Sequence, residues 1–279
     1  LVVPNEMLRQ ANAAMSVSVR VTNLLGPAMA TGIAIVWGLN AALLALLVLW
    51  LLSAFGPPWP SEGEAVSRDR VGSNALGRFW GETLEGLREA KRHPWFMAGL
   101  MALTAVIAFG YSVSSVVVPI LSVEYYGGTL LLAGSATAYT AGALFGALFI
   151  SHLSEKVPGW IALGGLAAYG TVPLSLAAEL PILVPLVTFF IAGVGIEFFN
   201  VIWFTAIQRE VPQDKLARVS SIDFLFSYGL APLGLSVIVP MIELFGNAVV
   251  LGACAAICFA VPAIALLEKS SKTFSTPKN

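Results

Sequence analysis

Two charged residues lie inside long apolar stretches of this sequence, where a charged side chain is costly. Glu197 lies within the segment GVGIEFFN, residues 193–200, and Arg20 lies near the beginning of another stretch. If these stretches span a membrane, each charge costs about 3 kcal/mol on insertion scales and favours a functional role. A carboxyl group in an apolar cleft can take up a proton near neutral pH. Glu197 is therefore a candidate proton-binding group, and Arg20 is a second candidate on the same pathway.

Each of these residues also has a structural interpretation. Glu197 can form an ion pair or a hydrogen bond that only holds two helices together, and the long Arg20 side chain can extend to the membrane surface. Asn200 follows Glu197 by three residues, which puts both side chains on one face of a helix. Glu197 and Asn200 can then face the same cavity.

Aromatic residues in the apolar stretches can line a pocket for a bulky apolar solute, although many membrane aromatics serve in packing or at the interfaces. We assign Tyr139 and Trp203 to the solute and proton pathway. The wider set of candidates is Tyr111, Tyr139, Trp203, Phe204 and Tyr228.

Signatures of other chemistries are missing from the sequence. His93 and His152 have no metal-ligand spacing to a cysteine, and Cys254 and Cys258 lie one helical turn apart in an apolar stretch, where buried packing thiols are expected. A phosphate-binding loop with its lysine does not occur, nor does a basic stripe for nucleic acid. We therefore predict no metal, no cofactor, no enzymatic activity and no nucleic-acid partner.

The composition predicts a lipid environment for these residues. Of the 279 residues, 57% are hydrophobic and only 11% are charged, and the mean hydropathy is +0.83. Soluble domains carry about 25% charged residues, and a membrane helix needs about 20 apolar ones. The fold class is therefore an all-α polytopic membrane protein. Eight stretches are predicted to span: 12–37, 39–55, 95–121, 129–153, 159–178, 181–206, 219–242 and 246–268.

The distribution of positive charge predicts the orientation. Cytoplasmic loops collect Lys and Arg. With the N-terminus inside, the inner segments hold every basic residue except Arg20, and the outer turns hold Glu124, Glu179 and Glu243. Both termini are then cytoplasmic. The long polar segment between the second and third stretches is a linker whose residues 79–92 predict a short amphipathic helix.

Two similar segments each lead from a charged turn into an apolar stretch. They are PNEMLRQANA, residues 4–13, and VPQDKLARVSS, residues 211–221, and a constant shift of 208 residues aligns Val3 with Val211 and Gly26 with Gly234. Parallel repeats occur in transporters built from two similar halves. The two segments resemble the helix 4–5 and helix 10–11 connections of major facilitator superfamily transporters, and are most similar to the branch of enterobactin exporters and macrolide-efflux proteins.

This resemblance implies that the chain corresponds to helices 5–12 of a twelve-helix fold and lacks the first four. Because the chain has no initiator Met and no signal-peptide pattern, residue 1 is expected to lie inside a longer protein or to begin a truncated product. The implied divisions are the end of an N-terminal half, a cytoplasmic linker with its amphipathic helix, a six-helix C-terminal half and a cytoplasmic tail. Their ranges are 1–56, 57–94, 95–268 and 269–279.

Two motifs of the superfamily can be matched to this sequence. The antiporter motif resembles residues 26–32, with its features at Gly26, Pro27, Ala30, Thr31 and Gly32. The gating loop resembles residues 151–159, with its features at Ser151, Glu155, Lys156 and Gly159. Its usual first glycine is Ser151 and its usual basic pair is absent, which puts a gating role here in question.

The resemblance implies a secondary transporter that exports hydrophobic drugs, macrolides or siderophores in exchange for protons. Its partners would be the lipid bilayer, a small hydrophobic solute and protons, and the protein would be a monomer in a bacterial inner membrane. The alternative is a truncated fragment that does not transport and acts as a scaffold or partner subunit.

Overall fold

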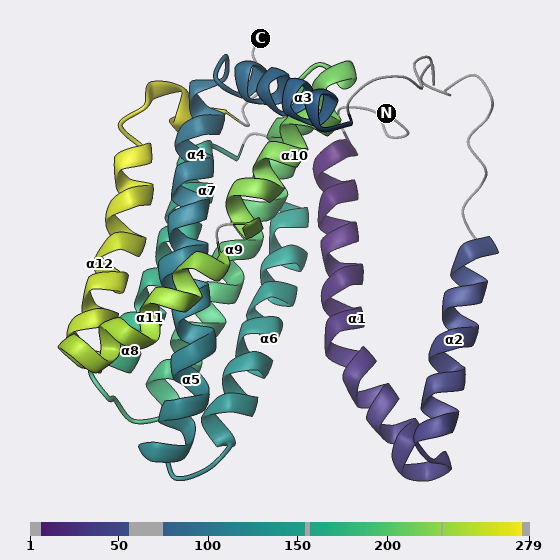
Figure 1. Ribbon diagram of the computed structural model, residues 1–279, viewed down its shortest axis with the longest axis vertical. Coiled ribbons are helices and arrows are strands. Elements are labelled where there is room, and N and C mark those ends of the chain that lie inside the picture. The colour runs from purple at the N-terminus through teal and green to yellow at the C-terminus, as the bar shows by residue number, and fades with distance from the viewer. Residues whose placement is uncertain (1–6, 56–74, 154–156, 230, 275–279) are drawn as a thin grey trace. The chain divides into compact units, whose positions relative to one another are not determined.

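The computed structural model describes residues 7–55, 75–153, 157–229 and 231–274, and every regular element within these ranges is helical. It consists of two compact units, Leu1–Arg20 with Glu82–Asn279 and Val21–Gly81. Figure 1 shows the course of the chain. The helices are α1 (Leu8–Trp37), α2 (Leu39–Phe55), α3 (Ala75–Ala90), α4 (Pro94–Ala105), η3 (Val106–Tyr111), α5 (Ser112–Glu124), α6 (Leu130–His152), α7 (Gly159–Ala167), η4 (Ala168–Gly170), α8 (Thr171–Ala177), α9 (Leu183–Glu210), α10 (Gln213–Gly229), α11 (Ala231–Phe245), α12 (Asn247–Ala265) and η5 (Lys269–Lys272).

The described residues of each of the eight predicted stretches are mainly helical, which confirms the all-α membrane fold class. Within the described ranges, five continuous helical segments are long and apolar enough to cross a membrane. They are Pro94–Glu124, Leu130–His152, Gly159–Ala177, Leu183–Glu210 and Asn247–Ala265. The seventh stretch is divided between α10 and α11, and α10 begins six residues before the predicted boundary, at Gln213.

Helix α9 is central to the larger unit and packs against α6 and α7. Gly142 and Gly146 of α6 form a small-residue seam with α9, because a Cβ atom at Gly142 would collide with the carbonyl of Phe190 and one at Gly146 would lie 3.0 Å from the carbonyl oxygen of Val194. Gly193 is the counterpart on α9, since a Cβ atom there would collide with the carbonyl of Tyr139. Small residues let the two backbones approach closely in lipid, where packing drives helix association.

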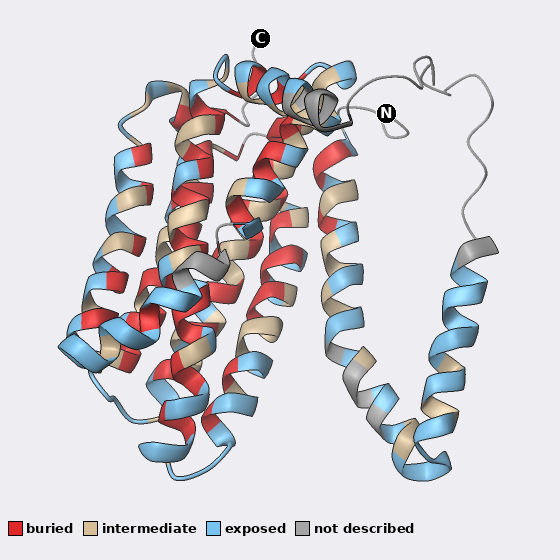
Figure 2. Cartoon of the chain, in the orientation of Figure 1, coloured by how far each residue is buried: buried red, intermediate tan, exposed pale blue. Residues whose placement is uncertain are grey.

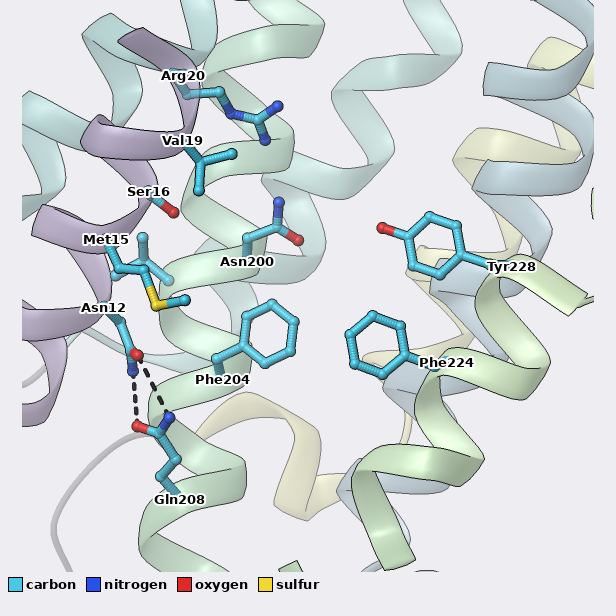
Figure 3. A pocket seen from close by; sticks show the side chains of 11 residues that line it. Asn12, Met15, Ser16, Val19, Arg20, Asn200, Phe204, Gln208, Phe224 and Tyr228 are labelled. Carbon is cyan, nitrogen blue, oxygen red and sulfur yellow. Dashed lines mark hydrogen bonds between the residues drawn. The ribbon is translucent and has the colours of Figure 1, made fainter. Parts of the chain in front are cut away.

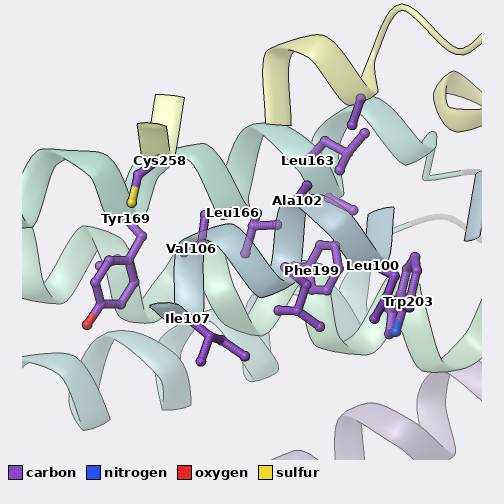
Figure 4. Close-up of a cluster of buried hydrophobic side chains, with 14 of the residues drawn as sticks. Leu100, Ala102, Val106, Ile107, Leu163, Leu166, Tyr169, Phe199, Trp203 and Cys258 are labelled. Atoms are coloured by element: carbon purple, nitrogen blue, oxygen red, sulfur yellow. The ribbon is translucent and has the colours of Figure 1, made fainter. Parts of the chain in front are cut away.

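The core of this unit contains large apolar side chains from α4, α7, α9 and α12. Figure 4 shows part of it, with Leu100, Phe199 and Trp203 close together and Cys258 beside Tyr169. Buried residues lie along the inward faces of these helices, as Figure 2 shows. Cys254 and Cys258 are free, buried thiols, which confirms the prediction of packing cysteines.

The helix from Pro94 to Glu124 contains a π-helical segment, η3, that hydropathy did not predict. Gly110 lies in this segment, and a Cβ atom there would come within 2.7 Å of the Tyr169 ring. Single-turn π-helices inside α-helices occur frequently at functional sites. The side chain that follows Gly110 is Tyr111, which is exposed.

The smaller unit contains the second part of α1, all of α2 and the first residues of α3. Gly38 joins α1 to α2 with φ of 87°, and its N–H donates to the carbonyl of Ala34, so this junction has the left-handed backbone that favours glycine. Leu43, Leu47 and Trp50 of α2 are exposed. A helix that exposes apolar side chains in this way is suited to a lipid or helix neighbour.

Helix α3 confirms the predicted amphipathic helix and shows contacts that were not predicted. Glu89 is buried, and its Oε2 lies 2.9 Å from Nζ of Lys215 at the beginning of α10. Glu85 pairs with Arg218, and a Cβ atom at Gly86 would lie 2.9 Å from the Arg218 carbonyl oxygen. We call these contacts of Glu85, Gly86 and Glu89 with Lys215 and Arg218 the α3–α10 clasp.

Candidate functional site

Arg20 and Glu197 form an ion pair between α1 and α9. Nη2 of Arg20 lies 2.9 Å from Oε2 of Glu197, and Nε donates to the same oxygen at 3.0 Å. The Glu197 side chain is fully buried, whereas that of Arg20 is 19% exposed. The interpretation that Arg20 extends to the membrane surface is therefore wrong, because its guanidinium is directed to a buried carboxylate.

The second oxygen of this carboxylate has no partner in the part of the chain that the structure describes. Oε1 of Glu197 is buried and accepts no hydrogen bond from the described residues. The carboxylate lies where α6 crosses α9, and a Cβ atom at Gly146 would come within 3.2 Å of the Glu197 Cβ. Buried polar atoms are nearly always hydrogen-bonded, and an orphaned one marks a site of stored strain or function. Glu197 therefore has one oxygen held by Arg20 and a second, buried oxygen without a partner in the described ranges.

A cavity of about 430 Å³ adjoins this ion pair. It lies among the first part of α1, the second half of α9 and α10, as Figure 3 shows. Small-molecule sites have volumes of about 300–1,000 Å³ and mix apolar walls with a few polar groups. The lining residues are Asn12, Met15, Ser16, Val19, Arg20, Asn200, Val201, Phe204, Gln208, Phe224 and Tyr228.

The two ends of the cavity differ. At one end, Nδ2 of Asn12 donates to Oε1 of Gln208 at 2.9 Å and to Oγ1 of Thr205 at 3.1 Å, so hydrogen bonds join α1 to α9 there. At the other end, Figure 3 shows Asn200 and the Tyr228 hydroxyl directed toward each other, with Arg20 nearby. At the first end side-chain hydrogen bonds join two helices, and the second end presents polar groups.

The structure brings together part of the predicted pathway. Asn200 lines the cavity next to Arg20, and Phe204 and Tyr228 from the wider aromatic set line it as well. Tyr139 is not a lining residue, but it is close enough to Arg20 and Glu197 to interact electrostatically with both.

Trp203 lies in the core instead of at the cavity. Its side chain is fully buried and stacks on Phe96 and Phe199, with ring centroids 5.1 and 5.2 Å away. Its Nε1 donates to Oδ1 of Asp223 at 3.1 Å. The assignment of Trp203 to the solute pathway is corrected accordingly, because neighbouring aromatic rings exclude it from the cavity surface.

Sequence reasoning missed Asn12, Ser16 and Phe224 as lining residues, although a signal for them exists. The lining residues recur every four positions on each helix, which places them on one helical face. The three sets are Asn12, Ser16 and Arg20 on α1; Asn200, Phe204 and Gln208 on α9; and Phe224 and Tyr228 on α10.

The two motif regions are described only in part. Ser151 bonds to the carbonyl of Leu148 within its own helix, and a Cβ atom at Gly159 would collide with the carbonyl of Ser271. Glu155 and Lys156 lie outside the described residues. Next to this loop, Nη2 of Arg9 donates to the carbonyl of Leu153 at 2.7 Å, so the beginning of α1 is bound to the end of α6.

In the antiporter-like motif, residues 26–32 are helical, and added Cβ atoms at Gly26 and Gly32 would meet nothing within 4 Å. The side chains of Pro27 and Thr31 lie outside the described part of the chain. Ala30 is exposed, and the role of this motif stays a prediction.

Across the described ranges, no group of three His, Cys, Asp or Glu side chains has the arrangement of a metal site. The cavity lining offers hydrogen-bonding groups and aromatic rings.

Comparison with known proteins adds one positive result. The family model described as Major Facilitator Superfamily matches residues 1–235. No curated protein and no solved structure matches the chain. The match covers most of the sequence and agrees with the helical membrane fold and with a cavity between α1 and α9. The chain thus belongs to the Major Facilitator Superfamily, a family of secondary transporters.

Proposed function

We propose that this member of the superfamily exports bulky hydrophobic solutes, such as drugs, macrolides or siderophores, in exchange for protons. The observation that carries the proposal is the buried Arg20–Glu197 ion pair beside a solute-sized cavity, with Oε1 of Glu197 unpaired. Ionisable groups inside a membrane typically mark proton relays and substrate pathways. The export direction rests on the likeness to exporters at residues 4–13 and 211–221 and at the Gly26–Pro27 motif.

The proposed coupling uses the two parts of the ion pair. Protonation of Glu197 removes the charge that holds Arg20, which weakens the contact between α1 and α9. Loss of the proton restores the pair. In a carrier built from two halves around a midplane site, making and breaking such contacts biases the rocking between its two open states.

In this proposal α1 and α9 belong to different halves. Residues 1–56 end the first half, 57–94 form the cytoplasmic linker, 95–268 form the second half and 269–279 form the tail. The concentration of Lys and Arg in alternate loops supports cytoplasmic termini. The apolar composition supports residence in a membrane, which we propose to be a bacterial inner membrane, and a single chain is proposed as the working unit.

The test compares coupled and uncoupled transport in vesicles. Glu197→Gln keeps the shape and the hydrogen-bonding ability of the side chain but cannot change its protonation. We expect proton-driven efflux of a dye or macrolide to fall at least about tenfold, equivalent to about 1.4 kcal/mol. Solute exchange without a proton gradient should persist, because that process needs no net proton movement.

The matched control is Glu243→Gln, which alters an exposed carboxylate away from the cavity. It should leave both assays unchanged. Proton-driven efflux that survives Glu197→Gln would remove Glu197 from the coupling mechanism. Absence of transport in the unaltered protein would favour the alternative of a membrane protein with a scaffold role.

A further inference from the structure

The cavity presents hydrogen-bond donors at one end. Nε and Nη2 of Arg20 both contact Oε2 of Glu197, and Nη1 has no hydrogen-bond partner among the described residues. The amide of Asn200 and the hydroxyl of Tyr228 likewise have no protein partner in the described ranges, and both line the cavity. The Asn200 amide and the Tyr228 phenol can both donate and accept, whereas the Arg20 guanidinium only donates, so Arg20 decides the preference at this end. A solute group bound at this end would therefore be an oxygen acceptor.

The positive charge exposed to the cavity also favours an acceptor as the bound solute group. Arg20 is the charged side chain among the lining residues, whereas Glu197 is fully buried behind it. A positively charged amine would approach a guanidinium, which is unfavourable because like charges repel. A carboxylate would be attracted, and a neutral carbonyl could still accept hydrogen bonds without breaking the ion pair.

The apolar walls of the cavity indicate the shape of the solute body that carries the acceptor group. Figure 3 shows the rings of Phe204 on α9 and Phe224 on α10 facing each other across the cavity. Met15 and Val19 of α1 add apolar surface on a third side. Flat aromatic groups gain most from contact with such rings, through offset stacking or edge-to-face packing.

We propose that the solute of this cavity is a flat apolar molecule carrying an oxygen acceptor, and that the cavity rejects organic cations. The acceptor, a carboxylate or a carbonyl, lies against Arg20, Asn200 and Tyr228. The flat body lies between Phe204 and Phe224. This inference rests on the proposed function and narrows it, because it limits the solutes of the same cavity to flat molecules with an acceptor and so leaves out the non-planar macrolides.

Equilibrium binding to the purified protein in detergent tests this inference with four probes of similar size. They are 2-naphthoate, its neutral amide 2-naphthamide, the cation 2-naphthylmethylammonium and the non-planar decalin-2-carboxylate. We expect the naphthoate or the amide to bind at least about tenfold more tightly than the ammonium compound. The naphthoate should also bind more tightly than its saturated analogue. The ratio of naphthoate to amide distinguishes a carboxylate from a carbonyl as the natural acceptor.

Two exposed residues of α10 allow variants that leave the core intact. Tyr228→Phe removes one hydroxyl donor and should weaken binding of the acceptor probes about tenfold. Phe224→Ala removes one wall and should weaken binding of all planar probes. Leu225→Ala is the matched control, because Leu225 is similarly exposed on α10 but does not line the cavity.

The inference is overturned if the ammonium probe binds as tightly as the acceptors, if no acceptor probe binds at millimolar concentration, or if Leu225→Ala matches Tyr228→Phe. These outcomes are separate from failure of the proposed function, because binding in detergent needs no proton gradient. Selective acceptor binding without proton-driven efflux would reject the export mechanism and keep the solute class. Efflux of cations that depends on Glu197 would keep the export mechanism and reject the solute class.

Discussion

Arg20 on α1 and Glu197 on α9 are 177 positions apart in the sequence, and their side chains meet at 2.9 Å inside the larger unit of the structure. The pair connects two helices that belong to different halves in the proposed carrier. Because the Glu197 side chain is fully buried, loss of Arg20 would leave a carboxylate charge that the surroundings do not solvate. The pair is therefore a structural tie between α1 and α9 as well as a candidate site of proton binding.

This dual role predicts strong non-additivity in stability. Arg20→Met alone leaves a buried, unpaired carboxylate and should cost about 3–5 kcal/mol of unfolding free energy. The double variant Arg20→Met with Glu197→Leu replaces both charges by apolar groups and should recover most of that loss. Denaturant unfolding in micelles, analysed as a double-mutant cycle, measures the coupling. Additive losses would show that the two charges do not depend on each other.

The sequence predicted the membrane helices well because length and apolar composition determine them locally. It also selected Arg20, Glu197 and Asn200 as candidates, since a polar residue in an apolar stretch is visible without a structure, and these three residues lie at or beside the cavity. The pairing of Arg20 with Glu197 could not be predicted, because it depends on how α1 packs against α9. The same limit explains Trp203, whose type suited a pocket but whose neighbours Phe96 and Phe199 enclose it.

Close packing between α6 and α9 gives a prediction that can be checked with a matched pair of glycines. Gly142→Ala would bring a methyl group against the Phe190 carbonyl and should destabilise the protein by about 1–3 kcal/mol. Gly164→Ala, also within a helix, meets nothing within 4 Å and should be neutral or stabilising. Thermal unfolding of the two purified variants provides the comparison. Equal effects at both positions would contradict the seam.

The α3–α10 clasp predicts a specific dependence of stability on pH. The hydrogen bond from Lys215 is the main influence that lowers the pKa of Glu89 from its ordinary value of 4.5. A carboxyl group whose pKa is lower in the folded state stabilises the protein above its unfolded pKa. That contribution is lost as the pH falls through the folded value.

Glu89→Gln should therefore lower the melting temperature at pH 7, and the difference from the unaltered protein should narrow below pH 4.5. Melting curves of both proteins across this range test the prediction. Glu243→Gln, at an exposed position, serves as the control and should show no such trend. If the difference between the two melting temperatures widened on acidification, Glu89 would not be stabilised by Lys215 in the α3–α10 clasp.

The proposed orientation predicts which face of the membrane each loop occupies. Lys91 is exposed after α3, and Gly128 lies between α5 and α6 in open space. In a background with Cys254→Ala and Cys258→Ala, a cysteine at Lys91 should react with an impermeant thiol reagent only from the cytoplasmic side. A cysteine at Gly128 should react only from outside. The opposite pattern would reverse the topology that the distribution of Lys and Arg predicts. The export assignment, which uses that topology, would then lose its support.

The hydrogen bond between Asn12 and Gln208 predicts a gate at one end of the cavity. Its two side chains come from α1 and α9 and lie 2.9 Å apart, so rocking of the proposed halves must separate them when that end opens. In the same cysteine-free background, Asn12→Cys with Gln208→Cys should be joined by a short, reducible thiol cross-linker. Joining the two should slow transport at least about tenfold, because opening of a closed gate often limits turnover. Reduction should restore the rate, and either single cysteine should respond little to the reagent. Full transport by the cross-linked protein would mean that α1 and α9 stay together at this end throughout the cycle, and that the cavity opens elsewhere.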